Sequence, residues 1–153
     1  MSTERKACIM MKKSLCAGII LVICLLSACG GKKQENTVPH YKDGHYSAEA
    51  VPEEIGGIIR LDITVSGGKI AAVEMQNLDK DGSEKGKEYG KASEGATNPG
   101  LYRIAQASVE NTAKFPEMLI AAQTPDGVDS ISGATLSHDA FVQAAREALK
   151  AAE

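Results

Sequence analysis

The sequence has 153 residues and a formal net charge of −3, and 43% of its residues are hydrophobic, which is enough for one domain with a core. No cysteine follows Cys29, which excludes a disulfide, a thiol nucleophile and a cysteine-ligated metal centre from the chain beyond it. Residues 1–28 hold four of the 17 basic and one of the 20 acidic residues, so the remainder has 13 basic and 19 acidic residues and a formal net charge of −6. This acidic balance argues against nucleic acid as a partner.

The N-terminus has the features of a secretory signal. Two lysines at 12–13 precede an almost unbroken apolar run at 15–26. The run is shorter than the ~20 residues that a stable membrane-spanning helix needs, and it has the length of a signal-peptide core. We therefore expect this segment to direct export.

The end of the apolar run predicts attachment to a lipid. Residues 26–29 read Leu-Ser-Ala-Cys, which resembles the lipobox of bacterial lipoproteins. The resemblance implies that residues 1–28 are a lipoprotein signal peptide and that Cys29 carries a lipid. Residues 29–40 would then tether a domain of residues 41–153 to the extracytoplasmic face of the cell membrane. An uncleaved membrane anchor is the alternative.

The first half of the domain predicts a small antiparallel sheet with one solvent-exposed face. We expect strands at 45–49, 58–65 and 70–75, the last two joined by a tight turn at Gly67-Gly68. The side chains expected on the buried face are Ile59, Leu61, Ile63, Val65, Ala71, Val73 and Met75.

The second half predicts helices. Residues 77–100 form a long loop rich in glycine and charge, and helices are expected at 101–114 and 117–123. A last, amphipathic helix would begin with Ser137 as its N-cap, with Asp139 in its first turn and Lys150 in its last. The apolar stripe expected on the first helix is Leu101, Ile104, Ala105, Ser108, Val109 and Thr112, and that on the last is Ala140, Phe141, Ala144, Ala145, Ala148, Leu149 and Ala152. The fold class is therefore α+β, with a small antiparallel sheet packed against the C-terminal helix.

The segment at 129–135, Asp-Ser-Ile-Ser-Gly-Ala-Thr, stands out as a candidate site. We expect a strand that ends at Gly133 and turns into the last helix. Free N–H groups at a helix start, with the positive end of the helix dipole, suit a phosphate. The hydroxyl of Thr135 would lie at the mouth of this anion site.

The same segment resembles the flavinylation signature of FMN-binding domains. These domains occur in the C subunit of the sodium-pumping NADH:quinone oxidoreductase, in the G subunit of Rnf-type complexes and in flavin lipoproteins of extracellular electron transfer. Their pattern is Asp, two variable residues, Ser or Thr, then Gly-Ala-Thr, and the fixed positions here are Asp129, Ser132, Gly133, Ala134 and Thr135. The resemblance implies FMN attached through its phosphate to Thr135 by a FAD:protein FMN transferase. Asp129 and Ser132 would then serve recognition by the transferase or shape the turn, and Gly133 would let the backbone approach the phosphate closely.

Other candidates are weaker. The triplet Gly-Ala-Thr recurs at 95–97, but Lys91 takes the place of the Asp, so we predict no flavin at Thr97. We expect no metal site, because His40 and His45 lack a cluster of further ligands. His138 is either near the phosphate or an exposed helix residue. The aromatic residues that could flank a flavin ring are Tyr46, Tyr89, Tyr102 and Phe115, for most of which core packing is the alternative role.

The sequence thus predicts a lipid-anchored extracytoplasmic flavoprotein that carries electrons, with no catalytic residues of its own. FMN would link an unidentified donor to an unidentified acceptor. Two alternatives remain open: a non-covalent FMN-binding reductase or oxidase, and a binding lipoprotein without a redox role.

Overall fold

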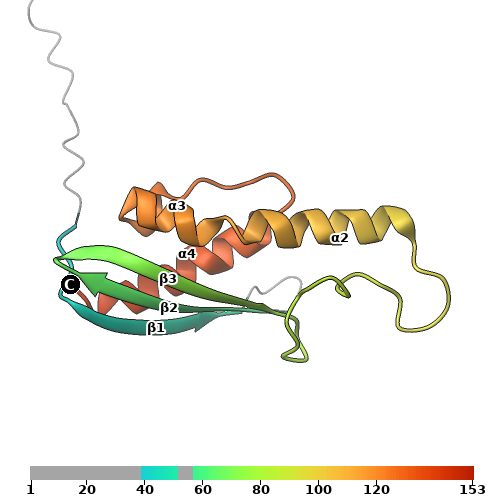
Figure 1. Cartoon of the computed structure of the whole chain (residues 1–153), viewed down its shortest axis with the longest axis horizontal. Coiled ribbons are helices and arrows are strands. Elements are labelled where there is room, and N and C mark those ends of the chain that lie inside the picture. Colours follow the sequence, from blue (N-terminus) through green and yellow to red (C-terminus); the bar gives the residue numbers. More distant parts are fainter. Residues whose placement is uncertain (1–38, 52–56) are drawn as a thin grey trace, which may run out of the picture. The chain divides into compact units, whose positions relative to one another are not determined.

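The computed structural model describes residues 39–51 and 57–153, which belong to one compact unit. The expected signal peptide, the expected lipidation site Cys29 and the expected tether up to residue 38 lie outside the described residues. The described part combines a three-stranded sheet with helices, which confirms the predicted α+β class (Figure 1). Within it, no helix is both long enough and apolar enough to cross a membrane.

The sheet is antiparallel, with the middle strand in sequence also in the middle of the sheet. Its strands are β1 (Gly44–Ala50), β2 (Ile58–Ser66) and β3 (Lys69–Leu78). The predicted alternation of β2 is confirmed, since its four apolar side chains at 59, 61, 63 and 65 are at most 3% exposed. The turn to β3 has φ of +62° at Gly67 and +76° at Gly68, as a two-residue type I′ hairpin requires.

A β-bulge changes the face that β3 presents at its start. Thr64 pairs with Ala72 and Val65 pairs with Ile70, so Ala71 is an extra residue between two pairs. Ile70 is buried and Ala71 is exposed, which makes the prediction of Ala71 on the core face wrong. The reason is that an inserted residue reverses the alternation of the strand. Beyond the bulge, half-buried side chains alternate from Val73, as predicted.

Helix α4 (Thr135–Lys150) packs on the sheet against β1 and β2 (Figure 1). Its predicted stripe is confirmed, because all seven of those residues are at most 3% exposed. Most of them are alanines, whose small side chains let the helix approach the strands closely. Helix α4, which begins with Thr135, is therefore packed against the core.

Helix α2 (Pro99–Thr112) begins two residues earlier than predicted. Asn98 caps it, its Oδ1 accepting from Gly100 N at 2.9 Å and from Leu101 N at 3.2 Å, while Pro99 needs no N–H partner. The predicted stripe is wrong as a core face, since Leu101 and Ile104 are each 64% exposed and only Thr112 of the stripe is buried.

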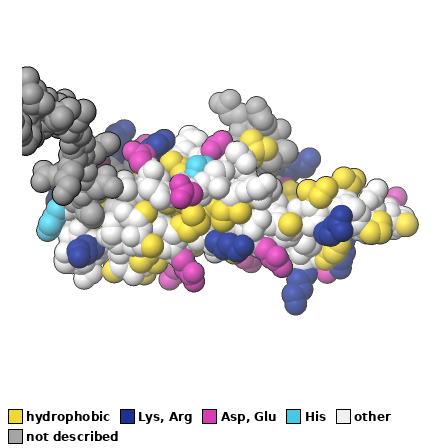
Figure 2. Space-filling model, turned by 90° about the horizontal axis from the view of Figure 1, so that it is seen from above, with side chains coloured by type: hydrophobic (Ala, Val, Ile, Leu, Met, Phe, Trp, Pro, Cys, Tyr) yellow, Lys and Arg dark blue, Asp and Glu magenta, His cyan; other side chains and the backbone are white. Residues whose placement is uncertain are grey.

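The cause is the position of α2, whose N-terminal half extends beyond the end of the sheet (Figure 1). The early turns of the helix therefore have no strand beneath them. Figure 2 shows hydrophobic side chains on the surface at this end of the molecule. Amphipathic spacing predicted the helix correctly but not what its apolar stripe contacts.

Helix α3 (Phe115–Ala122) covers β3, and the short 3-10 helix η1 (Pro125–Gly127) follows it. Pro116 lies in the first turn of α3, where a missing N–H costs nothing. Gln123 ends α3 with φ of +60°. Its side chain accepts from Ile70 N at 2.9 Å and donates to Ile70 O at 2.9 Å, so it satisfies the edge of β3 at the bulge.

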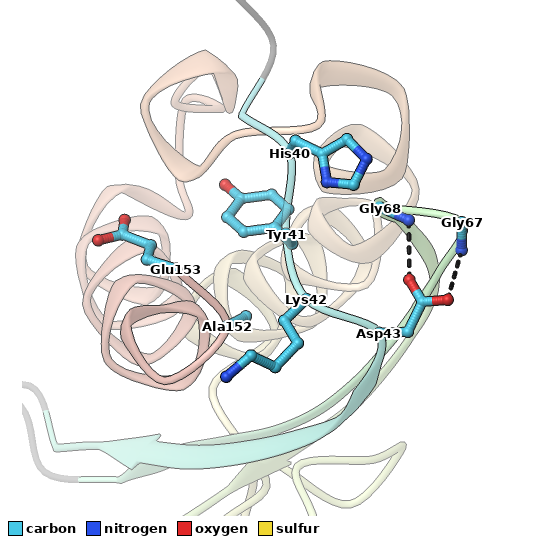
Figure 3. Close-up of a pocket in the computed structure, with 8 residues that line it drawn as sticks. All are labelled: His40, Tyr41, Lys42, Asp43, Gly67, Gly68, Ala152 and Glu153. Carbon is cyan, nitrogen blue, oxygen red and sulfur yellow. Dashed lines mark hydrogen bonds between the residues drawn. The ribbon is translucent and has the colours of Figure 1, made fainter.

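The two ends of the domain are joined in a clasp, formed by residues 41–43 with the β2–β3 turn and Ala152 (Figure 3). Tyr41 N donates to Gly68 O at 3.1 Å, and Lys42 N donates to Ala152 O at 2.6 Å. The Asp43 carboxylate accepts from the N–H groups of Gly68 at 2.8 Å and Gly67 at 3.0 Å. These two N–H groups lower the pKa of Asp43, and burial raises the pKa of the Tyr41 phenol.

Candidate functional site

The 129–135 segment is an irregular loop that ends in a tight turn. No strand is assigned to the described residues 128–134, so the prediction of a strand ending at Gly133 is wrong. Instead, Ala134 N donates to Ile131 O at 2.9 Å and closes a turn with Ser132 and Gly133 at its centre. Gly133 has φ of +84° and Ser132 does not have a positive φ, which defines a type II turn. Glycine suits this position because other residues are strained there.

Helix α4 begins at Thr135, two residues before the predicted cap. Ala134 occupies the N-cap position and caps with no side chain. The prediction of Ser137 as N-cap is wrong, because it is the third residue of the helix, and Asp139 lies beyond the first turn. Lys150 lies in the last turn, as predicted.

This start leaves helix N–H groups without partners among the described residues. The first bond of the helix runs from His138 N to Ala134 O at 2.8 Å. The N–H groups of Thr135, Leu136 and Ser137 precede it and have no carbonyl within the helix to bond. Three donors and the positive end of the dipole of a 16-residue helix therefore lie beside the Thr135 hydroxyl.

A cavity of about 250 Å³ lies at these N–H groups. It is lined by Ser108, Gly133, Ala134, Thr135, Leu136 and Ser137. Ala134 is 2% exposed, whereas Thr135 is exposed. Every lining side chain is uncharged, so backbone donors and hydroxyls determine what the cavity binds.

The structure brings together three of the five predicted site residues. Gly133, Ala134 and Thr135 line the cavity, while Ser132 contributes to the turn beside it. Asp129 is exposed and has no hydrogen-bond partner within the described ranges. An exposed, unengaged carboxylate is consistent with recognition by a second protein rather than with the shape of the turn.

His138 does not line the cavity, and its ring makes contacts that hold the loop before it. Its Nε2 lies 2.8 Å from Val128 O and its Nδ1 lies 2.9 Å from Asp139 Oδ1. The ring also meets Phe115 edge-on, with 5.6 Å between ring centroids. The prediction of an exposed helix residue is wrong, since the His138 side chain is only 16% exposed and holds the loop, while its proximity to a phosphate stays a prediction.

Sequence reasoning missed two residues of α2 that face the segment. Ser108 lines the cavity, and Asn111 Nδ2 donates to Ser132 O at 3.2 Å. Ser108 was assigned to a core stripe, and Asn111 was not considered. The spacing of three residues between them places both on one face of α2, which is the only signal the sequence contains.

The aromatic candidates lie away from the cavity at Thr135. Phe115 is fully buried in the core, and Tyr46 donates to Lys42 O at 2.8 Å. Tyr102 donates to Lys87 O at 2.8 Å and so holds the 79–98 loop against α2. Core packing, the alternative role expected for most of the four, is confirmed for Phe115 and Tyr46, while Tyr89 and Tyr102 lie outside the core cluster.

Lys85 and Tyr89 form a pair within the 79–98 loop. The Lys85 ammonium lies 5.0 Å from the centroid of the Tyr89 ring. Burial lowers the pKa of Lys85 and raises the pKa of Tyr89. Together with the hydrogen bond from Tyr102 to Lys87 O, this contact holds the middle of the 79–98 loop in place.

The second Gly-Ala-Thr triplet has a different environment. The hydroxyl of Thr97 accepts from Ala92 N at 3.2 Å. Helix α2 starts two residues later, but Asn98 already binds its first N–H groups. The absence of flavin at Thr97 stays a prediction, now with the reason that this helix start is capped.

Two other features were weighed as sites. Among the described residues, no group of three or more His, Cys, Asp or Glu side chains is placed to hold a metal ion. An open hollow of about 590 Å³ lies beside the clasp (Figure 3). Its Asp43 carboxylate is already bound to the two turn N–H groups, and it lies at the C-terminal end of α4, away from Thr135.

Comparison with known proteins gives one family match and two similar structures. The family model described as FMN-binding domain matches residues 55–150, which include the whole 129–135 segment. A crystal structure of a Clostridium perfringens protein is 28% identical, with a TM-score of 0.57 over 73% of this chain and 88% of that one. A solution NMR structure of a Clostridium thermocellum protein is 28% identical, with a TM-score of 0.44 over 72% and 91%. No curated protein matches the chain significantly.

Proposed function

The chain belongs to the family of FMN-binding domains, and from this premise we propose that it carries FMN covalently on Thr135 and transfers electrons. The observation that carries the proposal is the uncapped start of α4, where three free N–H groups and the Thr135 hydroxyl border one cavity. Uncharged donors at a helix start suit a phosphate. Gly133 adds no side chain to the mouth of the cavity.

The size of the cavity supports attachment through the phosphate. Pockets that enclose a whole drug-sized ligand measure roughly 300–1,000 Å³. The cavity at Thr135 is about 250 Å³, which suits the phosphate end of FMN. A ligand held only at this end would dissociate easily outside the cell, and a phosphoester prevents that loss.

The attachment reaction that we propose uses FAD as donor. The Thr135 oxygen forms a bond to the phosphorus of the FMN half, the pyrophosphate bond breaks, AMP leaves and the hydroxyl proton is released. No titratable side chain lines the cavity, so we expect the FAD:protein FMN transferase to supply the base. The exposure of Thr135 and Asp129 gives that partner access.

Once attached, FMN supplies chemistry that amino acids lack, since it accepts and releases one or two electrons. The absence of a nucleophile–base pair at the cavity favours an electron carrier over an enzyme with its own substrate. We further propose that the domain is held at the extracytoplasmic face of the cell membrane through a lipid on Cys29. Its donor and acceptor would then be other redox proteins or quinones near that surface.

The covalent claim is tested by producing the exported domain with and without the transferase. We expect an FMN phosphoester mass on the peptide that contains Thr135, lost in Thr135→Ala and kept in Thr97→Ala. An unmodified wild type in the presence of active transferase, or a modified Thr135→Ala, would contradict the proposal.

The same preparation separates the alternatives. Flavin that denaturation releases, with turnover of a nicotinamide donor, would indicate a non-covalent reductase. A colourless protein would indicate a binding lipoprotein. The anchor is tested separately by labelling cells with a radioactive fatty acid, which should mark the wild type and not Cys29→Ala.

A further inference from the structure

We propose that Asn111 is a positioning residue for flavin attachment, because it sets the orientation of the turn that precedes Thr135. This inference rests on the proposed function and adds to it a residue outside the 129–135 segment. The contact that suggests it is the bond from Asn111 Nδ2 to Ser132 O at 3.2 Å. It joins α2 to the attachment segment.

The orientation of the Asn111 amide is fixed from its other side. Lys114 Nζ donates to Asn111 Oδ1 at 2.8 Å. An ammonium group can only donate and a carbonyl can only accept, so the amide oxygen must face Lys114 and the amide NH₂ must face Ser132. A flipped amide would place donor against donor and acceptor against acceptor. Lys114 therefore makes Asn111 a donor to the turn.

The bonded carbonyl is the one that decides the turn type. In the turn from Ile131 to Ala134, the central peptide consists of Ser132 C=O and Gly133 N–H. Type I and type II turns differ by the orientation of this peptide, and the type II form needs a positive φ at its third residue. Gly133, with φ of +84°, permits that form, and the Asn111 bond stabilises it.

The orientation of this peptide affects the attachment site directly. Because the peptide is planar and trans, a flip of Ser132 C=O also reverses Gly133 N–H. Gly133 lines the cavity, and Thr135 is two residues further on. Ser108, one turn before Asn111 on α2, lines the cavity from the other side. One face of α2 thus provides both a wall of the cavity and the bond that holds the turn.

The sharpest test is Asn111→Asp, which keeps the size of the side chain and the acceptor for Lys114 but removes the donor to Ser132. We expect FMN attachment by the transferase, measured at limiting domain concentration, to slow about threefold to tenfold, as the loss of one hydrogen bond implies. Asn111→Gln keeps a donor amide and should recover most of the rate. Amide hydrogen exchange at Ala134, whose N–H closes the turn, should become faster in Asn111→Asp.

Asn98→Ala is the matched control, because it removes an asparagine that caps α2 and does not contact the segment. It should lower stability while leaving attachment and Ala134 exchange unchanged. Wild-type rates and exchange in Asn111→Asp, or equal slowing in Asn98→Ala, would overturn the inference. If the wild type acquires no FMN, the proposed function fails, and Ala134 exchange still decides whether Asn111 holds the turn.

Discussion

His138 holds the carbonyl of Val128, ten residues earlier in the chain, with 2.8 Å between Nε2 and O. The carbonyl can only accept, so Nε2 is the donor. This bond fixes the start of the loop on the helix that the loop leads into. Asn111 fixes Ser132 at the other end of the loop. The 129–135 segment is therefore held by hydrogen bonds near both of its ends, while Thr135 stays exposed.

We expect His138→Ala to lower the free energy of unfolding by about 1–3 kcal/mol, the sum of a hydrogen bond and an aromatic contact with Phe115. Urea denaturation measures the change. His138→Gln retains a donor at a similar reach and should lose less. His45→Ala, which removes an exposed contact with Thr64 at 3.1 Å, should have a small effect. Equal losses in His138→Ala and His45→Ala would contradict the role of the Val128 bond.

Gly133→Ala tests the turn itself. No atom lies within 4 Å of a Cβ placed at Gly133, so the cost comes only from its φ of +84°. We expect a loss of about 1–2 kcal/mol in unfolding free energy. Gly86→Ala is the control, because the space there is also open and φ is not positive. A neutral Gly133→Ala variant would mean that the turn readily takes another form.

The sequence predicted the elements in which local pattern and tertiary contact agree. The alternation at 58–65 and the alanine stripe of α4 correspond to faces that are buried. It failed where a contact distant in sequence decides the outcome. Ala71 is the extra residue of a bulge that its pairing with β2 determines. Leu101 has the spacing of an apolar helix face, but no strand lies beneath it.

The candidate site shows the same division. The five residues of the proposed attachment site lie within seven positions of one segment, so a motif could single out Thr135. The helix cap was misplaced by three residues, from Ala134 to Ser137, because Ser137 has the preferred chemistry of a cap while the backbone turn at Gly133 decides where the helix begins. Asn111 and His138 act through hydrogen bonds to backbone carbonyls, and because every residue has such a carbonyl, the sequence does not identify their partners.

The lowered pKa of Asp43 predicts how the stability of the domain depends on pH. The N–H groups of Gly68 and Gly67 lower its pKa in the folded state. Its contribution is therefore complete above the unfolded-state pKa, ~3.9, and is lost as pH falls through the lower folded value. We expect urea midpoints of the wild type to decline more steeply below about pH 4 than those of Asp43→Asn. Glu94→Gln, at an exposed residue, should follow the wild type.

The exposed half of α2 should tolerate polar residues. Leu101→Gln and Ile104→Gln should each change unfolding free energy by no more than about 0.5 kcal/mol, since neither side chain is in the core. Leu119→Ala, at a fully buried position of α3, should cost about 2–5 kcal/mol. If Leu101→Gln or Ile104→Gln lowered the unfolding free energy as much as Leu119→Ala, the predicted stripe of α2 would be a packed face after all.

The hydrogen bond between Lys42 and Ala152 in the clasp distinguishes the two ends of the domain. It places the point where the chain enters the domain at the C-terminal end of α4, while Thr135 is the first residue of the same helix. Sixteen residues at 1.5 Å each separate these two poles by about 24 Å. The flavin that we propose on Thr135 would thus lie at the end remote from the proposed tether. If the domain is anchored as proposed, a shorter tether would bring it closer to the membrane without obstructing the flavin.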